Sequence, residues 1–316
     1  MGAAAGIWRA MQRLADTDAM EVLREREAAM TPEIRPATSA DAEACGRIIF
    51  EAFRAIADQH GFSWDFPSAE AGTQLAETFI ATPSIYGVVA ELDGRVVGSN
   101  FVAEGDPIRG IGPITVDPAV QGSGIGRRLM EAALERAGDA MGVRLVQDAF
   151  NTRSMPLYAS LGFDVREPLL LMRGTPRSGP DLGFSVRPMA AGDVGACTDL
   201  CSSVHGVART HELQEALRVF TPFVVEREGR ITGYLSAATF WLMNHGVAET
   251  ELDMRALLVG AGAMRAEPLS LLLPTRQANL FRWCLHQGMR AIKPMTLMTM
   301  GHYQEPRGCC FPSVLY

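Results

Sequence analysis

The sequence predicts an α/β (α+β) protein in which a mixed, mostly antiparallel sheet is flanked by helices, and this plan is expected twice. Three blocks of similar sequence recur in the same order along the 316 residues. Short runs rich in β-branched residues alternate with segments of helical apolar spacing, as in layered α/β proteins. A Pro- and Gly-rich segment without apolar periodicity, residues 173–183, separates the two copies.

The elements of the first copy follow from local patterns, in chain order. A short strand ends at 34–36, and Ser39 is a candidate N-cap for a helix that continues through Phe53. Residues 86–104 alternate as a hairpin whose turn is Asp93-Gly94. A glycine-containing strand over 108–116, a helix over 127–138, a buried strand over 143–150, a short helix over 154–163 and a closing strand over 165–173 complete the copy.

The internal repeat depends on the order of its three blocks. Ile34-Arg35-Pro36 recurs as Val186-Arg187-Pro188, and residues 88–98 recur as 223–233. Leu161-Gly162-Phe163 and Pro168 recur as Gln287-Gly288-Met289 and Pro294. Collinear blocks of this kind indicate two diverged copies of one domain, expected over 33–174 and 184–316. Residues 1–32 lack a long apolar core and are expected to form an extra amphipathic helix.

Composition excludes several classes of protein. A net charge of −7 and a pI of about 5.5 argue against a general nucleic-acid binder, which normally carries a basic face. The six cysteines are scattered without ligand spacing, so neither a disulfide framework nor a metal site is expected. No membrane span or targeting segment is recognisable, which makes the cytoplasm the expected location.

Three glycines at alternate positions open the helix predicted over 127–138. Gly122, Gly124 and Gly126 let successive main-chain N–H groups converge on one point, and the helix N-terminus adds a favourable dipole for an anion. A pyrophosphate cradle is the favoured interpretation, and a simple tight turn is the alternative. The P-loop lysine is missing, and so is the third glycine of a dinucleotide fingerprint, which disfavours a nucleotide-dependent oxidoreductase.

Two motifs together resemble the GNAT superfamily of acyl-CoA-dependent N-acyltransferases. The first is Gln121-x-x-Gly124-x-Gly126 after a strand that ends in Val116-Asp117-Pro118, and the second is the segment NTRSMPLYASLGF over 151–163. The resemblance implies a tandem protein with a catalytic GNAT domain over 33–174 and a degenerate GNAT-like domain over 184–316. It also implies acetyl-CoA as the cosubstrate, a direct attack by the amine of a small molecule or peptide, and no metal.

The resemblance assigns residues to the acyl-CoA site. Ile114, Thr115 and Val116 lie on the strand that bulges and splays in this family and would bind the pantetheine arm. The pyrophosphate would be held by the main-chain amides of Gln121, Gly122, Ser123, Gly124, Ile125, Gly126 and Arg127. Asn151 and Ser154 would contact the pantetheine arm, and Tyr158 would protonate the departing thiolate as general acid.

The general base and the acceptor pocket are less specified. Glu104, Asp106 and Asp148 are the candidate bases, with ordered water as the alternative. The loop after the first helix carries Phe62, Trp64 and Asp65 next to His60. These side chains are expected either to line the acceptor pocket or to cap the core.

The second copy lacks the glycine motif, and Gln277 and Cys284 stand where the first copy has Asn151 and Tyr158. It is expected to have lost acyl-CoA binding and to complete the acceptor pocket, stabilise the first copy or form a homodimer. A non-catalytic CoA-sensing or protein-interaction module with the same fold is the alternative function. Neither nucleic acid nor a membrane is an expected partner.

Overall fold

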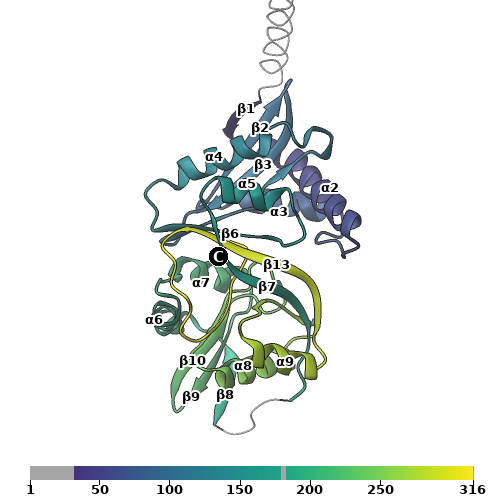
Figure 1. Cartoon of the computed structure of the whole chain (residues 1–316). Helices are drawn as coiled ribbons and strands as arrows, with labels where there is room; N and C mark the ends of the chain where they lie inside the picture. The colour runs from purple at the N-terminus through teal and green to yellow at the C-terminus, as the bar shows by residue number, and fades with distance from the viewer. Residues whose placement is uncertain (1–31, 179–182, 316) are drawn as a thin grey trace, which may run out of the picture.

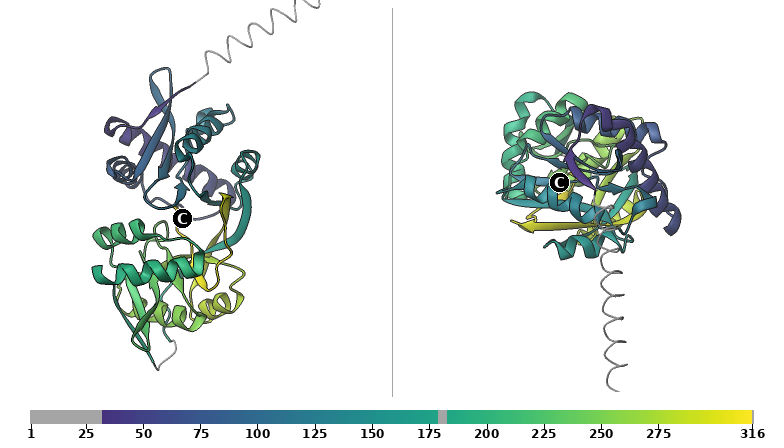
Figure 2. Two further views of the ribbon diagram at one scale, coloured as in Figure 1. Left: turned by 90° about the vertical axis from the view of Figure 1, so that its left-hand side faces the viewer. Right: turned by 90° about the horizontal axis from the view of Figure 1, so that it is seen from above.

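The computed structural model describes residues 32–178 and 183–315, so the helix predicted over 1–32 lies outside the described residues apart from its last position. Two lobes follow one another in the chain, and long strands run between them (Figure 1). The side view separates the purple-to-blue segments of the first lobe from the green segments of the second (Figure 2). None of the helices in the described ranges has the length and hydropathy needed to cross a lipid bilayer.

The elements of the first copy occur in the predicted order, except that the single strand predicted over 108–116 is divided into β4 and β5. They are β1 (Glu33–Pro36), η1 (Ser39–Asp41), α2 (Ala42–His60), α3 (Ala69–Ala81), β2 (Ile85–Leu92), β3 (Arg95–Ala103), β4 (Ile108–Ile111), β5 (Thr115–Val116), η2 (Pro118–Val120), α4 (Ile125–Ala137), β6 (Gly142–Asp148), α5 (Ser154–Ser160) and β7 (Asp164–Gly174).

The second copy repeats this order with differences near its end. Its elements are β8 (Phe184–Pro188), η3 (Ala191–Asp193), α6 (Val194–His205), α7 (Thr210–Val219), β9 (Phe223–Arg227), β10 (Arg230–Leu235), β11 (Gly246–Ala248), α8 (Glu251–Ala263), β12 (Leu269–Pro274), α9 (Ala278–His286), β13 (Arg290–Gly301) and β14 (Cys309–Phe311). The mixed α/β class expected from the sequence is confirmed, with two sheets flanked by helices.

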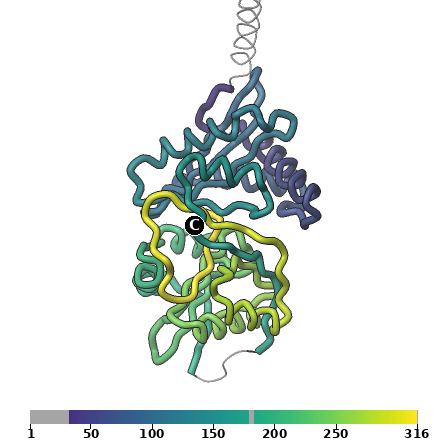
Figure 3. Tube along the Cα trace, viewed as in Figure 1, coloured from purple at the N-terminus to yellow at the C-terminus, as the bar shows by residue number. Residues whose placement is uncertain are grey.

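The two copies exchange their closing strands. The larger sheet has the order β1-β2-β3-β4-β6-β13-β7-β12, with β5 paired to β3, and the smaller sheet has the order β14-β11-β10-β9-β8. Strand β13 of the second copy therefore lies between β6 and β7 of the first copy, and β7 pairs in turn with β12. The yellow trace of β13 runs along the teal trace of β7 in Figure 3.

An approximate two-fold axis passes through this exchange. Pro168 and Pro294 are equivalent positions of the repeat, so Leu169 and Met295 are equivalent as well, and these two residues pair directly. Two equivalent strands that pair antiparallel at equivalent residues are related by a two-fold rotation. The strands therefore interlock the two copies through main-chain hydrogen bonds.

The core of the first copy lies on both faces of its sheet. One cluster includes Met130 and Ala133 of α4 and Tyr158 of α5, and another packs Ile49 of α2 and Phe79 of α3 against the sheet. Each large side chain buried in this way stabilises the fold by about 1.5–3 kcal/mol. Helices α2 and α3 approach closely, since a Cβ on Gly46 would lie 2.3 Å from Thr73.

Each copy begins with the same ion-pair network. Arg35 donates to Asp41 at 2.8 Å and to Glu91 at 2.9 Å, and the second copy repeats the contacts with Arg187. Asp41 also accepts the Thr38 main-chain N–H at 2.8 Å, which ties the start of α2 to β1. The Arg35 hydrogen bonds lower the pKa of Asp41 to about 2, against the opposing effect of burial.

Asp41→Asn is expected to lower the free energy of unfolding at pH 7 by about 2 kcal/mol, because hydrogen bonds to a charged group are lost. Since the folded-state pKa of Asp41 is depressed, its contribution is complete above about pH 4 and disappears as the pH falls toward 2. Urea denaturation at several pH values measures the difference. The exposed Asp139→Asn is the control, and a difference that persisted at pH 2 would contradict the ion-pair explanation.

Candidate active site

A gap opens in the larger sheet where β5 leaves β6. Strand β4 runs parallel to β6 only as far as the pair Gly110 and Arg144. Beyond that point Thr115 and Val116 of β5 pair with Ser99 and Gly98 of β3 alone. The edge of β6 from Leu145 to Asp148 therefore has no strand partner on this side among the described residues, and the sheet splays into a V.

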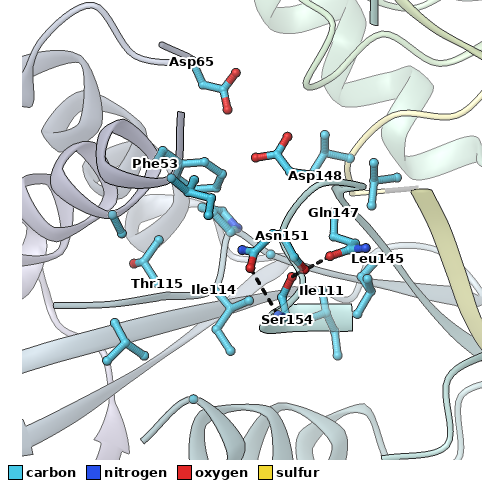
Figure 4. Close-up of a pocket in the computed structure, with 18 of the residues that line it drawn as sticks. Phe53, Asp65, Ile111, Ile114, Thr115, Leu145, Gln147, Asp148, Asn151 and Ser154 are labelled. Atoms are coloured by element: carbon cyan, nitrogen blue, oxygen red, sulfur yellow. Dashed lines mark hydrogen bonds between the residues drawn. The ribbon is translucent and has the colours of Figure 1, made fainter. Parts of the chain in front are cut away.

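A cavity of about 580 Å³ occupies the V. Figure 4 shows Ile114 and Thr115 on one side, with Leu145, Gln147 and Asp148 of β6 on the other. Of the residues that the sequence predicted for the site, those that line the cavity are Asp65, Ile114, Thr115, Val116, Gln121, Gly122, Gly124, Ile125, Gly126, Arg127, Asp148, Asn151, Ser154 and Tyr158. Glu104, Ser123, Phe62 and Trp64 are not among its lining residues.

The glycine loop ends at the N-terminus of α4. Gly122 and Gly124 have φ values of +87° and +86°, a conformation that side-chain-bearing residues rarely adopt. A Cβ at either glycine would meet no atom within 4 Å, so open space lies in front of both. The hydrogen bonds found in the described residues include none donated by the main-chain N–H groups of 121–127. These donors at a helix N-terminus suit an anionic ligand.

Polar side chains hold the loop and the following helix in place. Gln121 Nε2 donates to the Val116 carbonyl at 3.0 Å, which ties the loop to β5. Asn151 Oδ1 accepts the Ser154 main-chain N–H at 3.3 Å, and Ser154 Oγ donates to Gln147 Oε1 at 2.5 Å, the two contacts dashed in Figure 4. The Ser123 hydroxyl instead donates to the Val120 carbonyl at 2.7 Å.

Tyr158 lies on α5 at the cavity wall. The side chain is 6% exposed and packs edge to face against Phe163. Burial raises the pKa of its hydroxyl above the ordinary value, Ser154 opposes this shift, and the Asp148 charge adds to it. Tyr158 therefore keeps its proton at neutral pH and can donate it inside the cavity.

The three candidate carboxylates lie in different places. Asp148 ends β6 and lines the cavity, and burial raises the pKa of its carboxyl. Glu104 lies away from the lining and accepts two hydrogen bonds from Arg136, at 2.7 and 2.9 Å. Asp106 accepts the main-chain N–H groups of His211 and Glu212 at the start of α7, each at 3.0 Å. Only Asp148 of the three combines burial with contact to the cavity.

The residues of the aromatic loop after α2 differ in whether they contact the cavity. Asp65 lines the cavity, whereas Phe62 stacks on Phe150 with ring centroids 4.3 Å apart. Trp64 is 46% exposed, and its indole N–H donates to Asp58 at 2.7 Å. The structure thus brings the acid of this loop to the cavity and leaves both of these aromatic side chains outside its lining.

Sequence reasoning missed Gln147 and, although it considered that the second copy completes the pocket, named none of the residues involved. Gln147 lines the cavity, and its buried Nε2 has no hydrogen-bond partner among the described residues. The second copy contributes Trp241, Leu242, Met243, Met295, Val314 and Leu315. One available signal is Lys293, the single lysine among 29 basic residues, whose ammonium lies between Asp65 and Asp148.

No group of three or more His, Cys, Asp or Glu side chains within residues 32–178 and 183–315 is arranged to hold a metal ion. The cavity lining includes two guanidinium groups, Arg127 and Arg153, one phenol, Tyr158, and two carboxylates, Asp65 and Asp148.

Comparison with known proteins identifies the family of one part of the chain, residues 49–163. The sequence model of the acetyltransferase (GNAT) family matches residues 49–163. A mycothiol acetyltransferase from Thermomonospora curvata is 38% identical over 78 residues, which are 24% of this chain and only 26% of that protein.

Two solved structures cover nearly the whole fold. A putative acetyltransferase from Pyrococcus horikoshii superposes with a TM-score of 0.68 at 18% identity, covering 88% of this chain and 94% of that one. A tandem GNAT protein from the clavulanic acid biosynthesis pathway superposes with a TM-score of 0.53 at 15% identity, covering 85% and 98%. Residues 49–163 therefore belong to the GNAT acetyltransferase family, within a chain that has the fold of a tandem GNAT protein.

Proposed function

We propose that the protein is an N-acetyltransferase that moves the acetyl group of acetyl-CoA to a primary amine of a small molecule or peptide by direct attack. The observation that carries the proposal is that the main-chain N–H groups of 121–127 donate no hydrogen bond found in the described residues, and that all of these residues except Ser123 line the same cavity as Tyr158. The same cavity therefore has donors that suit a diphosphate and a protonated phenol.

The residues divide the work along the cavity. The loop over 121–127 holds the pyrophosphate, with Arg127 and Arg153 adding positive charge at its rim. The main chain of Ile114, Thr115 and Val116, left unpaired toward β6, takes the amides of the pantetheine arm, next to Asn151 and Ser154. A main-chain N–H group directed at the thioester carbonyl also stabilises the oxyanion that forms as the amine attacks.

Proton transfer uses two side chains. Tyr158 gives its proton to the departing sulfur, because its raised pKa keeps it protonated at neutral pH. Asp148 accepts the proton of the acceptor amine, in preference to Glu104, which is held by Arg136 outside the cavity lining.

We further propose one acyl-CoA site per chain, in the unit over 33–174, with the unit over 184–316 completing the acceptor side. The helix equivalent to α4 is α8, whose N-terminus is occupied by the protein itself. Thr250 and Asp253 form a reciprocal capping box there, and the Asp253 carboxylate also binds Arg227. A fixed buried carboxylate at this position excludes a phosphate.

The proposal predicts that CoA binds the intact protein with a stoichiometry of one per chain. Isothermal titration calorimetry measures this number, and a thiol-reactive dye records CoA release when acetyl-CoA is mixed with a panel of primary amines. Absence of CoA binding would refute the acyl-CoA site, and two equal sites would refute the assignment of the second copy. CoA binding without thiol release from any amine would favour the non-catalytic CoA-binding alternative.

A further inference from the structure

The only lysine of the chain is buried between two aspartates at the wall of the cavity. Lys293 Nζ donates to Asp65 Oδ2 at 2.7 Å and lies 2.6 Å from Asp148 Oδ1. The side-chain exposures are 2% for Lys293, 8% for Asp65 and 5% for Asp148. The Trp241 ring covers the ammonium, with Nζ 5.3 Å from the ring centroid. Such an arrangement is costly to bury and so needs an explanation.

Three distant segments bring these charges together. Asp65 comes from the loop between α2 and α3, Asp148 from the end of β6, and Lys293 from β13 of the second copy. The β13–β7 pairing shifts register between Ala291 and Lys293, a β-bulge that re-aims the strand at this point. The Ala149 N–H donates to the Pro294 carbonyl at 3.1 Å and fixes the end of β6 beside the lysine.

The cluster carries one more negative charge than positive. Two carboxylates face one ammonium, and the cations that line the cavity are Arg127 and Arg153 at the glycine loop. A buried excess charge is compensated either by a proton on one carboxylate or by a cation from the cavity. Figure 4 shows the carboxylates of Asp65 and Asp148 directed toward one another, away from Ser154 and Thr115. Apart from the Lys293 ammonium at 2.6 Å, no donor meets Asp148 Oδ1 within the described chain.

We propose that Asp65 and Asp148, held by Lys293 of the second copy, form the subsite that receives the acceptor as its ammonium ion. This inference rests on the proposed acetyl transfer and names the acceptor's charge state and the end of the cavity that binds it. Lys293 is a positioning residue, because it acts through the two carboxylates. The acceptor class is an alkyl amine without an adjacent carboxylate, because a carboxylate on the acceptor would be repelled by the two aspartates.

The acid–base step balances within this cluster. The ammonium ion gives one proton to Asp148, and the freed nitrogen pair forms the C–N bond with the thioester carbon. The C–S bond breaks as the oxyanion collapses, Tyr158 gives its proton to the sulfur, and the acylated nitrogen returns one proton to Tyr158. Asp148 then releases its proton to solvent.

The groups around Asp148 set the direction in which a variant shifts the pKa of its carboxyl. Burial raises its pKa, Lys293 on β13 opposes this and Asp65 on the α2–α3 loop adds to it. Tyr158 on α5 is the third ionisable group that faces it, and His60 packs on Phe150 two residues away.

The single lysine allows a direct binding experiment. Protein labelled with ¹⁵N-lysine and saturated with CoA gives one side-chain Nζ resonance, which is followed during titration with 2-phenylethylamine, butylamine and their alcohols. We expect the amines to move the resonance at concentrations at least tenfold lower than the alcohols. Asp65→Asn is expected to weaken the amines tenfold or more, whereas the exposed Asp58→Asn leaves them unchanged. Equal responses to amine and alcohol, or none to either, would overturn the proposal.

A second measurement separates positioning from a merely structural role. In the pH profile of kcat, Lys293→Met is expected to move the acidic limb to higher pH and Asp65→Asn to lower pH, each by about one unit. Shifts of the same sign, or no shift, would count against the cluster. If the resonance responds to amines but no amine releases thiol, the proposed acetyl transfer fails while the amine subsite stands. If CoA does not bind the wild-type protein, the proposed acetyl transfer is refuted, but the amine subsite is not.

Discussion

Replacement of Tyr158 by phenylalanine is expected to lower kcat for acetyl transfer by about 100-fold or more, with CoA affinity unchanged. General acid catalysis contributes on the order of 10²–10⁴ to the rate. Tyr158 is the only phenol lining the cavity described here, and burial keeps it protonated. The phenyl ring retains its packing against Phe163, so the variant removes one hydroxyl with little other change. Stopped-flow detection of thiol release measures kcat, and calorimetry on the same preparation measures the affinity for CoA.

Tyr86→Phe is the matched control. Tyr86 lies on β2 outside the cavity lining, beneath the guanidinium of Arg136, and loses the same hydroxyl. Its kcat is expected to stay within about twofold of the wild type. If Tyr158→Phe also retains its rate, the departing thiolate needs no proton from this residue. If, in addition, the wild-type protein acetylates amines no faster than the uncatalysed reaction, the non-catalytic CoA-binding alternative gains support.

The exchange of closing strands explains why the candidate site needs both copies. From Leu145 to Asp148, strand β6 has β13 as its neighbour on one side and the open V on the other, so removal of the second copy would leave this part of β6 with two free edges. An edge of this kind is prone to pair with other chains. The tail also enters the first copy, because Leu315 packs with Phe66 and Phe79 and its carbonyl occupies the space beside Gly110.

Local signals predicted the first copy well. The hairpin turn at Asp93-Gly94 and the glycine loop before α4 follow from residues near in sequence, whereas the strand predicted over 108–116 is divided into β4 and β5. Glycines with positive φ and periodic apolar residues act over a few positions, so a single sequence is enough to recognise them.

The strand exchange could not be read in the same way. Residues 164–174 and 290–301 have similar apolar patterns, and a strand's partner is set by long-range packing that neither pattern encodes. Glu104 was misplaced by the same limitation, because its partner Arg136 lies on α4 and draws it away from the cavity. The contacts of Lys293 depend on the position of β13 beside β6, which no local pattern predicts.

Gly124→Glu is expected to weaken CoA binding by about 100-fold or more. A side chain here would project from the N-cap of α4 into open space, where the diphosphate is proposed to bind. Loss of charge-assisted hydrogen bonds, together with like-charge repulsion, costs about 3 kcal/mol, which corresponds to roughly two powers of ten in Kd. Calorimetry with CoA and with dephosphorylated pantetheine locates the loss, because pantetheine lacks the diphosphate and is expected to lose less than tenfold.

Gly94→Glu is the matched control for this variant. Gly94 has a φ of +72° in the β2–β3 turn and also has no atom within 4 Å of a Cβ, so the same substitution carries the same backbone strain. That strain costs about 1–2 kcal/mol in either variant and should lower both melting temperatures alike. Only Gly124→Glu should weaken CoA binding, because only Gly124 lies at the cavity. Unchanged CoA affinity in Gly124→Glu would mean that the diphosphate does not bind at the N-terminus of α4.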